Sequence, residues 1–221
     1  MISRNRLIVA SVLILIFILA GLIGGPTNGI DKAISAGAAH IRSGEPVLAQ
    51  MAAGVTLLGG MPFTLGATAI ASLCLLWRRQ QGVALLLIAV VAGERLLVDG
   101  LKDWVGRPRP ELEALPSSLA YPSGHAANSM TAFLAIALIA FPARTRRTAA
   151  FLAIGISILI GLTRIIIGVH WTSDVVGGWA LGLLAVGLAI VVGERSGALP
   201  EETKHKVIGG HYPPTGEDQA A

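Results

Sequence analysis

Long apolar runs, separated by short polar segments, dominate the sequence. Six of these runs approach the length of about 20 residues that crosses the hydrocarbon core of a bilayer. They cover residues 7–23, 61–77, 83–100, 126–141, 149–168 and 175–193. A single water-soluble core would not need so many long segments with so little charge. The pattern therefore predicts an all-α, polytopic membrane protein built as a bundle of six transmembrane helices.

Residues 31–44 carry a different pattern from the long runs. Ile34 and Ile41 are set against Lys32 and Arg42, which makes the segment mildly amphipathic. Such a segment predicts a helix that lies on the membrane surface or packs across the outer ends of the bundle.

The two ends of the chain differ from the bundle. Arg4 and Arg6 before the first apolar run are typical of a signal peptide or of a first membrane span. No small-x-small cleavage site follows cleanly, which favours an uncleaved span. From Ser196 onward the chain is polar and has no usable periodicity. We therefore expect a six-span membrane domain over residues 1–195 and a flexible cytoplasmic tail over residues 196–221.

The placement of the charges predicts an orientation in the membrane. Hydrophobic residues make up 53% of the chain and charged residues only 14%. Basic residues lie before the first run and after the second, fourth and sixth runs, at Arg4, Arg6, Arg78, Arg79, Arg144, Arg146, Arg147, Arg195, Lys204 and Lys206. The positive-inside rule assigns all of these positions to the cytoplasm. Both termini are then cytoplasmic, and the other connections are extracytoplasmic.

Two polar segments, residues 102–125 and 163–174, fall on the extracytoplasmic side in this topology. The first contains Lys102, Arg107 and Arg109. Cations beside a membrane span can simply contact lipid headgroups, but a proline-stiffened cluster on the outer side breaks the charge rule. Lysine supplies a point charge, and arginine can hold two phosphate oxygens at once. The cluster therefore indicates binding of a phosphoryl group.

Pro122-Ser123-Gly124-His125 directly precedes the fourth apolar run. Ser123 is explained equally well as an ordinary N-cap and Gly124 as a turn residue. The same geometry leaves backbone N–H groups and the positive end of a helix dipole available to an anion. In that interpretation Ser123 and Gly124 donate to phosphate oxygens, and His125 gives a proton to a leaving oxygen.

The second polar segment contains Thr163, Arg164, His170 and Asp174. A lone histidine near a membrane interface is usually structural. Here Asp174 follows four residues after His170, close enough to accept a hydrogen bond from one ring nitrogen. That bond would orient the ring, raise its basicity and leave the other nitrogen free to attack. Arg164 adds a further ligand for phosphate.

These residues resemble the three signatures of the type 2 phosphatidic acid phosphatase family. The matches occur in the family's order and internal spacing: Lys102 with Arg109-Pro110, Pro122-Ser123-Gly124-His125, and Arg164 with His170 and Asp174. They span about the central third of the chain, and the six-span layout extends the resemblance to nearly all of it. Thr163 stands where the family usually has serine, and Arg107 lies outside the signature positions.

The resemblance implies a lipid phosphatase that needs no metal and no cofactor. His170 would attack phosphorus and form a phosphohistidine, Asp174 would orient His170, and His125 would protonate the leaving group and later activate water. The remaining residues would hold the phosphate and stabilise its transition-state charge: Lys102, Arg109, Ser123, Gly124 and Arg164, with Thr163 and Arg107 as weaker candidates.

The substrate implied by the resemblance has a lipid tail in the outer leaflet and a phosphate or diphosphate at the interface. Isoprenyl diphosphates, phosphatidic acid and phosphatidylglycerol phosphate all fit, in a membrane that we take to be a bacterial inner membrane. No nucleic-acid partner is expected, and the oligomeric state is left open. One alternative is a phosphotransferase of the same fold. Another is a non-catalytic transporter or binder of lipid phosphates, which would not need the His170–Asp174 pair. The soluble vanadium haloperoxidases are similar in these motifs, but six spans argue against their activity.

Two other features have structural interpretations. Gly178 and Gly182 form a GxxxG spacing, which predicts close helix packing within the bundle ahead of dimerisation. Trp104, Tyr121 and Trp171 fall at the outer membrane level, which predicts interfacial aromatic anchors.

Overall fold

The computed structural model of the protein describes residues 3–110 and 119–199. Within these residues the chain is helical and contains no β-strand, so the all-α prediction is confirmed. The elements are, in chain order, α1 (Arg4–Ile23), α2 (Gly29–Gly44), α3 (Pro46–Thr56), the 3-10 turn η1 (Leu57–Gly59), α4 (Met61–Trp77), α5 (Gln81–Val105), α6 (Gly124–Ala135), the π-helical turn η2 (Ile136–Ala140), α7 (Ala143–Ile166) and α8 (Thr172–Ser196).

Four helices in the described part of the chain, α1, α5, α7 and α8, are long and apolar enough to cross a membrane. A fifth span is added if α3 and η1 are counted together with α4, from which they bend by 42°. The remaining apolar element, α6 with η2, is shorter and covers Gly124–Ala140. Four predicted runs thus lie within a helical element, and the runs 126–141 and 149–168 extend one and two residues beyond theirs. The count of six spans stays a prediction.

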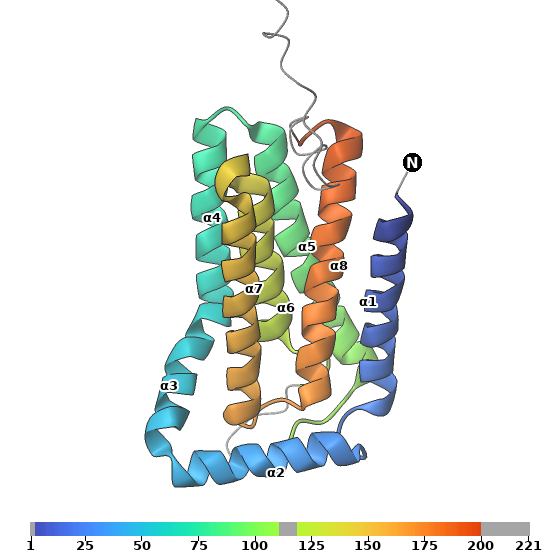
Figure 1. The fold of residues 1–221 in the computed structure, drawn as a ribbon, viewed down its shortest axis with the longest axis vertical. Helices are drawn as coiled ribbons and strands as arrows, with labels where there is room; N and C mark the ends of the chain where they lie inside the picture. The colour runs from blue at the N-terminus through green and yellow to red at the C-terminus, as the bar shows by residue number, and fades with distance from the viewer. Residues whose placement is uncertain (1–2, 111–118, 200–221) are drawn as a thin grey trace, which may run out of the picture.

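The long helices α1 and α4–α8 run along one axis, and α2 lies across their ends (Figure 1). α3 connects the far end of α2 to α4. α6 is central, because it contacts α4, α5, α7 and α8. α2 matches the amphipathic segment predicted for residues 31–44, and its position confirms that this segment packs across the ends of the bundle.

The outer surface of the bundle is strongly apolar. Leu85, Phe151 and Leu188 are 65%, 71% and 65% exposed. In the most apolar stretch of α1, only 6% of the residues are buried. In water, so large an apolar surface would promote association. In a bilayer it is the surface that lipid tails cover, which agrees with the membrane protein expected from the sequence.

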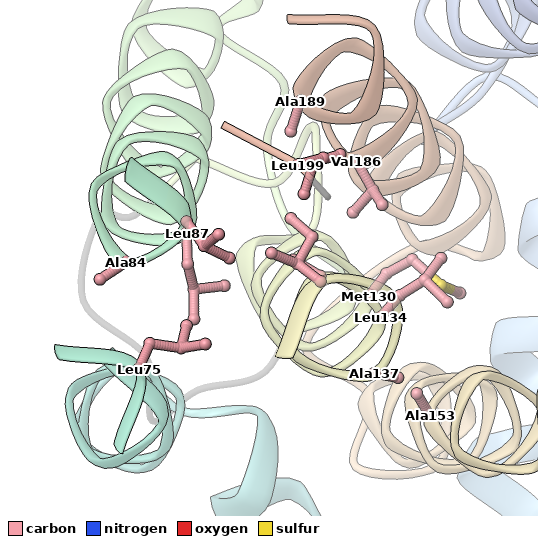
Figure 2. Packing of buried hydrophobic residues seen from close by; sticks show 13 residues of the cluster. Leu75, Ala84, Leu87, Met130, Leu134, Ala137, Ala153, Val186, Ala189 and Leu199 are labelled. Atoms are coloured by element: carbon pink, nitrogen blue, oxygen red, sulfur yellow. The ribbon is translucent and has the colours of Figure 1, made fainter. Parts of the chain in front are cut away.

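The interior is packed by a cluster at the end of the bundle away from α2. Leu87, Met130, Leu134 and Val186 meet there between α5, α6 and α8, as Figure 2 shows. Small residues such as Ala84 allow these helices to approach closely, which is the main source of helix association in lipid. The contacts between α5, α6 and α8 in this cluster are therefore made by apolar side chains.

Glycines on α8 determine how closely it approaches α6. A Cβ atom at Gly178 would lie 2.6 Å from the Ser123 carbonyl oxygen, and one at Gly182 would lie 2.8 Å from the Met130 Cβ. Neither neighbour can move easily, because the first is backbone and the second is in the core. The predicted role of these glycines in packing within the bundle is confirmed.

The arginine groups used to predict the orientation gather at one end of the molecule. The first residues of α1, the α4–α5 turn and the η2–α7 turn all lie at the end opposite α2 (Figure 1). Arg6 and Glu194 form an ion pair there, with Nη1 and Oε2 2.6 Å apart. Of the predicted tail, residues 200–221 lie outside the described residues.

Of the three aromatic residues predicted to be interfacial anchors, one has an exposed side chain and two are buried. Trp104 is 83% exposed, whereas Tyr121 and Trp171 are 1% and 8% exposed. Both buried rings use their polar atoms internally: the Tyr121 hydroxyl donates to the Phe17 carbonyl, and Trp171 Nε1 donates to the Pro108 carbonyl at 2.9 Å. A buried indole or phenol needs such a partner, and sequence position alone did not reveal that these partners exist.

Candidate active site

The two polar segments converge at the end of the bundle that α2 crosses. α5 ends there with Lys102 in its last turn, and Gly106 terminates this helix in a left-handed conformation with φ +64°. α6 begins there after Ser123, α7 ends there with Arg164, and α8 begins there at Thr172. Antiparallel helix packing thus brings together residues that are far apart in the sequence.

His170 and Asp174 form a buried pair at the start of α8. His170 Nδ1 lies 3.4 Å from Asp174 Oδ2, and the two side chains are 2% and 0% exposed. The same carboxylate oxygen accepts a 2.9 Å hydrogen bond from the backbone N–H of Trp171. The carboxylate therefore fixes both the first turn of α8 and the orientation of the imidazole.

Besides Arg107, three cations lie near this pair: Lys102 on α5, Arg109 in the loop that follows α5, and Arg164 in the last turn of α7. Lys102 Nζ donates to the Leu119 carbonyl at 2.8 Å, and Arg109 Nη1 donates to the Val169 carbonyl at 3.2 Å. Arg164 Nη1 donates to Thr56 Oγ1 at 3.0 Å. The partners of Lys102 and Arg164 in these bonds are neutral oxygens, so the bonds position the cations without cancelling their charge.

The turn before α6 presents an anion-binding geometry. The backbone N–H of Ser123 donates to the Asp174 carbonyl at 3.0 Å, which joins the turn to α8. Ser123 Oγ is fully buried and has no hydrogen-bond partner in the described part of the chain. A buried hydroxyl without a partner at a helix N-terminus is suited to a ligand oxygen. Gly124 follows at the first position of α6.

His125 lies on the first turn of α6, facing the start of α4. Its Nε2 would lie 3.8 Å from a Cβ atom built at Gly60. Electrostatic interactions couple its imidazole to His170 and to Arg164. The structure thus brings His125 to the same cluster as the His170–Asp174 pair.

The cations and burial act together on the titration of the site. Burial lowers the pKa of His170 well below its usual 6.5, and the nearby positive charges of Arg109, Arg164 and Lys102 lower it further, while a hydrogen bond with the Ala120 backbone opposes them. Burial likewise lowers the pKa of Arg109. The His170 imidazole is therefore neutral at physiological pH, the form in which it can act as a nucleophile.

The two weaker phosphate candidates have other contacts. Arg107 is buried, and its Nη1 donates to Asp174 Oδ1 at 2.8 Å. The Thr163 hydroxyl is also buried and donates to the Ile160 carbonyl at 2.6 Å. Arg107 thus contacts the carboxylate of the His170–Asp174 pair, whereas Thr163 contacts the backbone of its own helix.

Three residues that the sequence did not suggest hold this site from the N-terminal helices. Thr56 bonds Arg164, Asp31 bonds Ser173 beside Asp174, and Arg42 Nη1 donates to the Ile166 carbonyl at 2.7 Å. Each contact spans more than one hundred residues, and isolated polar residues near helix ends give no pattern that predicts such partners. In residues 3–110 and 119–199, no group of three His, Cys, Asp or Glu side chains is placed to hold a metal ion.

Comparisons with known proteins assign the chain to one family. The model of the PAP2 superfamily matches residues 82–197. Phosphatidylglycerophosphatase B of Bacillus subtilis is 34% identical over 168 residues, which cover 72% of this chain and 82% of that protein. An undecaprenyl-diphosphatase of Sulfolobus acidocaldarius is 30% identical over 51% of this chain and 56% of its own length. A lipid A 1-phosphatase of Rhizobium johnstonii is 35% identical over 53% of this chain and 50% of its own length.

The structural comparison agrees with the sequence matches. The crystal structure of the PAP2-type phosphatidylglycerolphosphate phosphatase from Bacillus subtilis superposes with a TM-score of 0.76 at 31% identity, over 84% of this chain and 96% of that one. The helical bundle is therefore shared with a lipid phosphatase, and the matched range of the family model includes the two polar segments. The chain belongs to the PAP2 superfamily and is a membrane enzyme of the lipid phosphatase type.

Proposed function

We propose that the protein hydrolyses a lipid phosphate or diphosphate through a phosphohistidine on His170, without a metal ion. The observation that carries this proposal is the buried His170–Asp174 pair among three cations, next to the unpartnered hydroxyl of Ser123. A transporter or simple binder would use the cations, but it would gain nothing from a neutral imidazole held by a carboxylate. This feature favours catalysis over binding alone.

In the first chemical step, His170 Nε2 attacks phosphorus and a P–N bond forms as the P–O bond to the lipid breaks. His125 donates a proton to the leaving oxygen, so that the lipid departs as an alcohol or, from a diphosphate, as a monophosphate. Lys102, Arg109 and Arg164 balance the charge on the phosphoryl oxygens. Ser123 and the first N–H groups of α6 donate to those oxygens as well.

In the second step, His125 accepts a proton from water, and the water oxygen attacks phosphorus. The P–N bond breaks, inorganic phosphate leaves, and His170 returns to its neutral form. Asp174 keeps the ring in one orientation throughout, because its Oδ2 is fixed by the Trp171 backbone.

The substrate is a lipid whose phosphate lies at the membrane interface. The site lies at the ends of apolar helices, where a headgroup at the interface can reach it while its tail stays in the bilayer. Isoprenyl diphosphate, phosphatidic acid and phosphatidylglycerol phosphate are the substrates that we propose. The positions of the arginine groups support a bundle of six spans, made by counting α3–α4 and α6–η2 as one span each, with the site on the extracytoplasmic side of a bacterial inner membrane.

The test is phosphate release by the purified protein in detergent with excess EDTA, over a panel of these lipids. We expect the wild type to release phosphate and His170→Ala to lose more than about 10³-fold in kcat, because the nucleophile is gone. Arg147→Gln, an exposed change at the opposite end, is the control and should match the wild type. Release that requires a metal, or that survives in His170→Ala, would contradict the mechanism.

A further inference from the structure

The two oxygens of Asp174 have different partners. Oδ2 faces His170 Nδ1 at 3.4 Å and the Trp171 N–H at 2.9 Å. Oδ1 accepts a 2.8 Å hydrogen bond from Arg107 Nη1. The contact with His170 is long for a hydrogen bond, whereas the contact with Arg107 has the length of a charge-assisted one. The strongest side-chain contact of the carboxylate is therefore with Arg107.

Arg107 is held by the protein on all sides. Nη2 donates to the carbonyls of Ala20 and Gly21, at 2.9 and 2.6 Å, and Nη1 also donates to Ser173 Oγ at 3.0 Å. Its guanidinium lies over the Tyr121 ring, 4.6 Å from the centroid. With 6% of its surface exposed, the guanidinium is a fixed internal cation.

Asp31 of α2 supports the same arrangement from the other side. Its Oδ2 accepts from Ser173 Oγ at 2.6 Å and from the Gly25 N–H at 2.6 Å, and its Oδ1 accepts from the Ser173 N–H at 3.0 Å. Gly25 has φ +98°, and a Cβ atom there would lie 3.0 Å from Arg107 Cδ. The loop between α1 and α2 can close over the guanidinium because this residue is glycine.

We propose that Arg107 is a positioning residue of the reaction, which keeps the Asp174 carboxylate oriented toward His170. Arg107 is itself held by Asp31 through Ser173. Arg107 lies outside the Lys102–Arg109 signature pair, and it acts on the carboxylate instead of on the phosphate. The chain of contacts runs from Asp31 to Ser173, Arg107 and Asp174. The first two helices of the chain thereby set the orientation of the nucleophile.

The physical argument is that a buried carboxylate without a cation is unstable as a charge. If Arg107 is lost, Asp174 can rotate or take up a proton, and either change releases His170 Nδ1 from its acceptor. The ring then samples orientations in which Nε2 does not face phosphorus. Binding of the phosphate by Lys102, Arg109 and Arg164 is not affected. The inference rests on the proposed function, because it assumes that His170 attacks phosphorus.

The test compares Arg107→Gln with Arg109→Gln, measuring kcat, KM and inhibition by inorganic phosphate. For Arg107→Gln we expect kcat to fall by about 10- to 100-fold, the size of effect that follows when the hydrogen-bond partner of a metal-binding side chain is removed. The inhibition constant of phosphate should not change. For Arg109→Gln the inhibition constant should rise. If Arg107→Gln weakens phosphate inhibition as Arg109→Gln does, or keeps the wild-type kcat, the proposal is overturned.

A double-mutant cycle with Asp174→Asn isolates the coupling. If Arg107 acts through Asp174, Arg107→Gln added to Asp174→Asn should change the remaining kcat by less than about two-fold, because residues that act as one unit are not additive. Effects that multiply would show that Arg107 acts independently and would refute the proposal. Arg107→Lys, which keeps the positive charge but loses the two Nη donors of the guanidinium, should recover part of the lost kcat.

Thermal unfolding in detergent shows whether Arg107→Gln still folds. If it does not, Asp31→Asn takes its place in the same cycle, with a several-fold smaller kcat expected alone and no further loss expected beside Asp174→Asn. Additive loss in that cycle would equally overturn the proposal. His170→Ala separates this inference from the function it rests on. Activity in that variant would reject the phosphohistidine. If His170→Ala is inactive but the effects of the Arg107 and Asp174 substitutions multiply, only the role of Arg107 is rejected.

Discussion

At the scale of single residues, the site combines a neutral imidazole with fixed positive charge. Burial and three cations lower the pKa of His170, so that Nε2 carries no proton and is free to attack phosphorus in the mechanism that we propose. The same cations would draw an anionic phosphate group to the ring. One group of side chains thus both prepares the nucleophile and binds its target.

This arrangement predicts the acid side of the pH profile. Because the folded protein lowers the pKa of His170 below 6.5, the neutral form persists as pH falls, and kcat/KM should decline only below that value. Arg109→Gln removes one of the charges that lower the pKa. The pKa of His170 then rises toward its usual value, and the acid limb of kcat/KM should move to higher pH.

The measurement is kcat/KM from pH 4 to 9, with about one-unit steps, for the wild type and Arg109→Gln on the same lipid. Using one substrate for both variants removes the titration of the substrate's own phosphate from the comparison. Coincident acid limbs would show that Arg109 does not act on His170 through its charge.

The sequence predicted a set of residues that the structure brings together, but it did not predict how they are held. Lys102, Arg109 and Arg164 could be recognised because phosphate chemistry requires fixed cations at a helix-end cluster. The partner of Asp174 could not, because Arg107 lies 67 positions away and looks like one more basic residue of the loop. Ion pairs between distant segments depend on the packing of the helices, which local patterns do not specify.

At the scale of elements, the contact between α6 and α8 controls the catalytic turn. Ser123 and its helix press against α8 at Gly178, where a Cβ atom would lie 2.6 Å from the Ser123 carbonyl and 2.9 Å from the Ala126 Cβ. The closeness of the two helices therefore decides where Ser123 and His125 lie relative to His170.

Gly178→Ala should separate the two helices. We expect a loss of about 1–3 kcal/mol in the free energy of unfolding, as for other overpacked interiors, and a fall in kcat of up to about 100-fold through displacement of the turn. Phosphate release and unfolding in mixed micelles measure both effects.

Gly187→Ala on the same helix is the matched control. Among the residues that the structure describes, no heavy atom lies within 4 Å of a Cβ atom built at that position. Alanine favours a helix over glycine by about 1 kcal/mol. Its activity should equal that of the wild type. Equal effects of the two substitutions would show that the contact between α6 and α8 does not position the turn.

Hydrophobic patterning located the long helices because a helix surrounded by lipid and by other helices is apolar over most of its length. The predicted run 61–77 coincides with α4, and the run 175–193 lies within α8. α3 (Pro46–Thr56) was missed, since it is short and is separated from α4 by a bend instead of a polar loop. The π-helical end of α6 was missed too, because its residues are as apolar as any other turn of the span.

At the scale of the whole molecule, the N-terminal helices complete a site whose signature residues lie further along the chain. The family match covers residues 82–197, yet Asp31, Arg42 and Thr56 all bond to the third signature or to residues beside it. α2 is attached near both of its ends and lies across the bundle on the side of the site (Figure 1). The bundle and its transverse helix therefore form one functional unit.

The remaining prediction concerns which side of the membrane carries the site. Ser43, exposed at the end of α2, and Thr145, exposed among Arg144, Arg146 and Arg147, lie at opposite ends of the molecule. In a Cys74→Ser background, which removes the only native cysteine, Ser43→Cys should react with a membrane-impermeant maleimide in spheroplasts. Thr145→Cys should react only after permeabilisation, because the arginines beside it are retained in the cytoplasm.

Phosphate release by each cysteine variant verifies that its fold is intact before labelling is compared. The reverse labelling pattern would place the site on the cytoplasmic side and would exclude lipids of the outer leaflet as its substrates. Labelling of Ser43→Cys alone in sealed spheroplasts would mean that the phosphate group is removed outside the cytoplasm. A lipid used on the inner face would then have to cross the membrane before this enzyme could act on it, because the fixed cations of the site reach headgroups of one leaflet only.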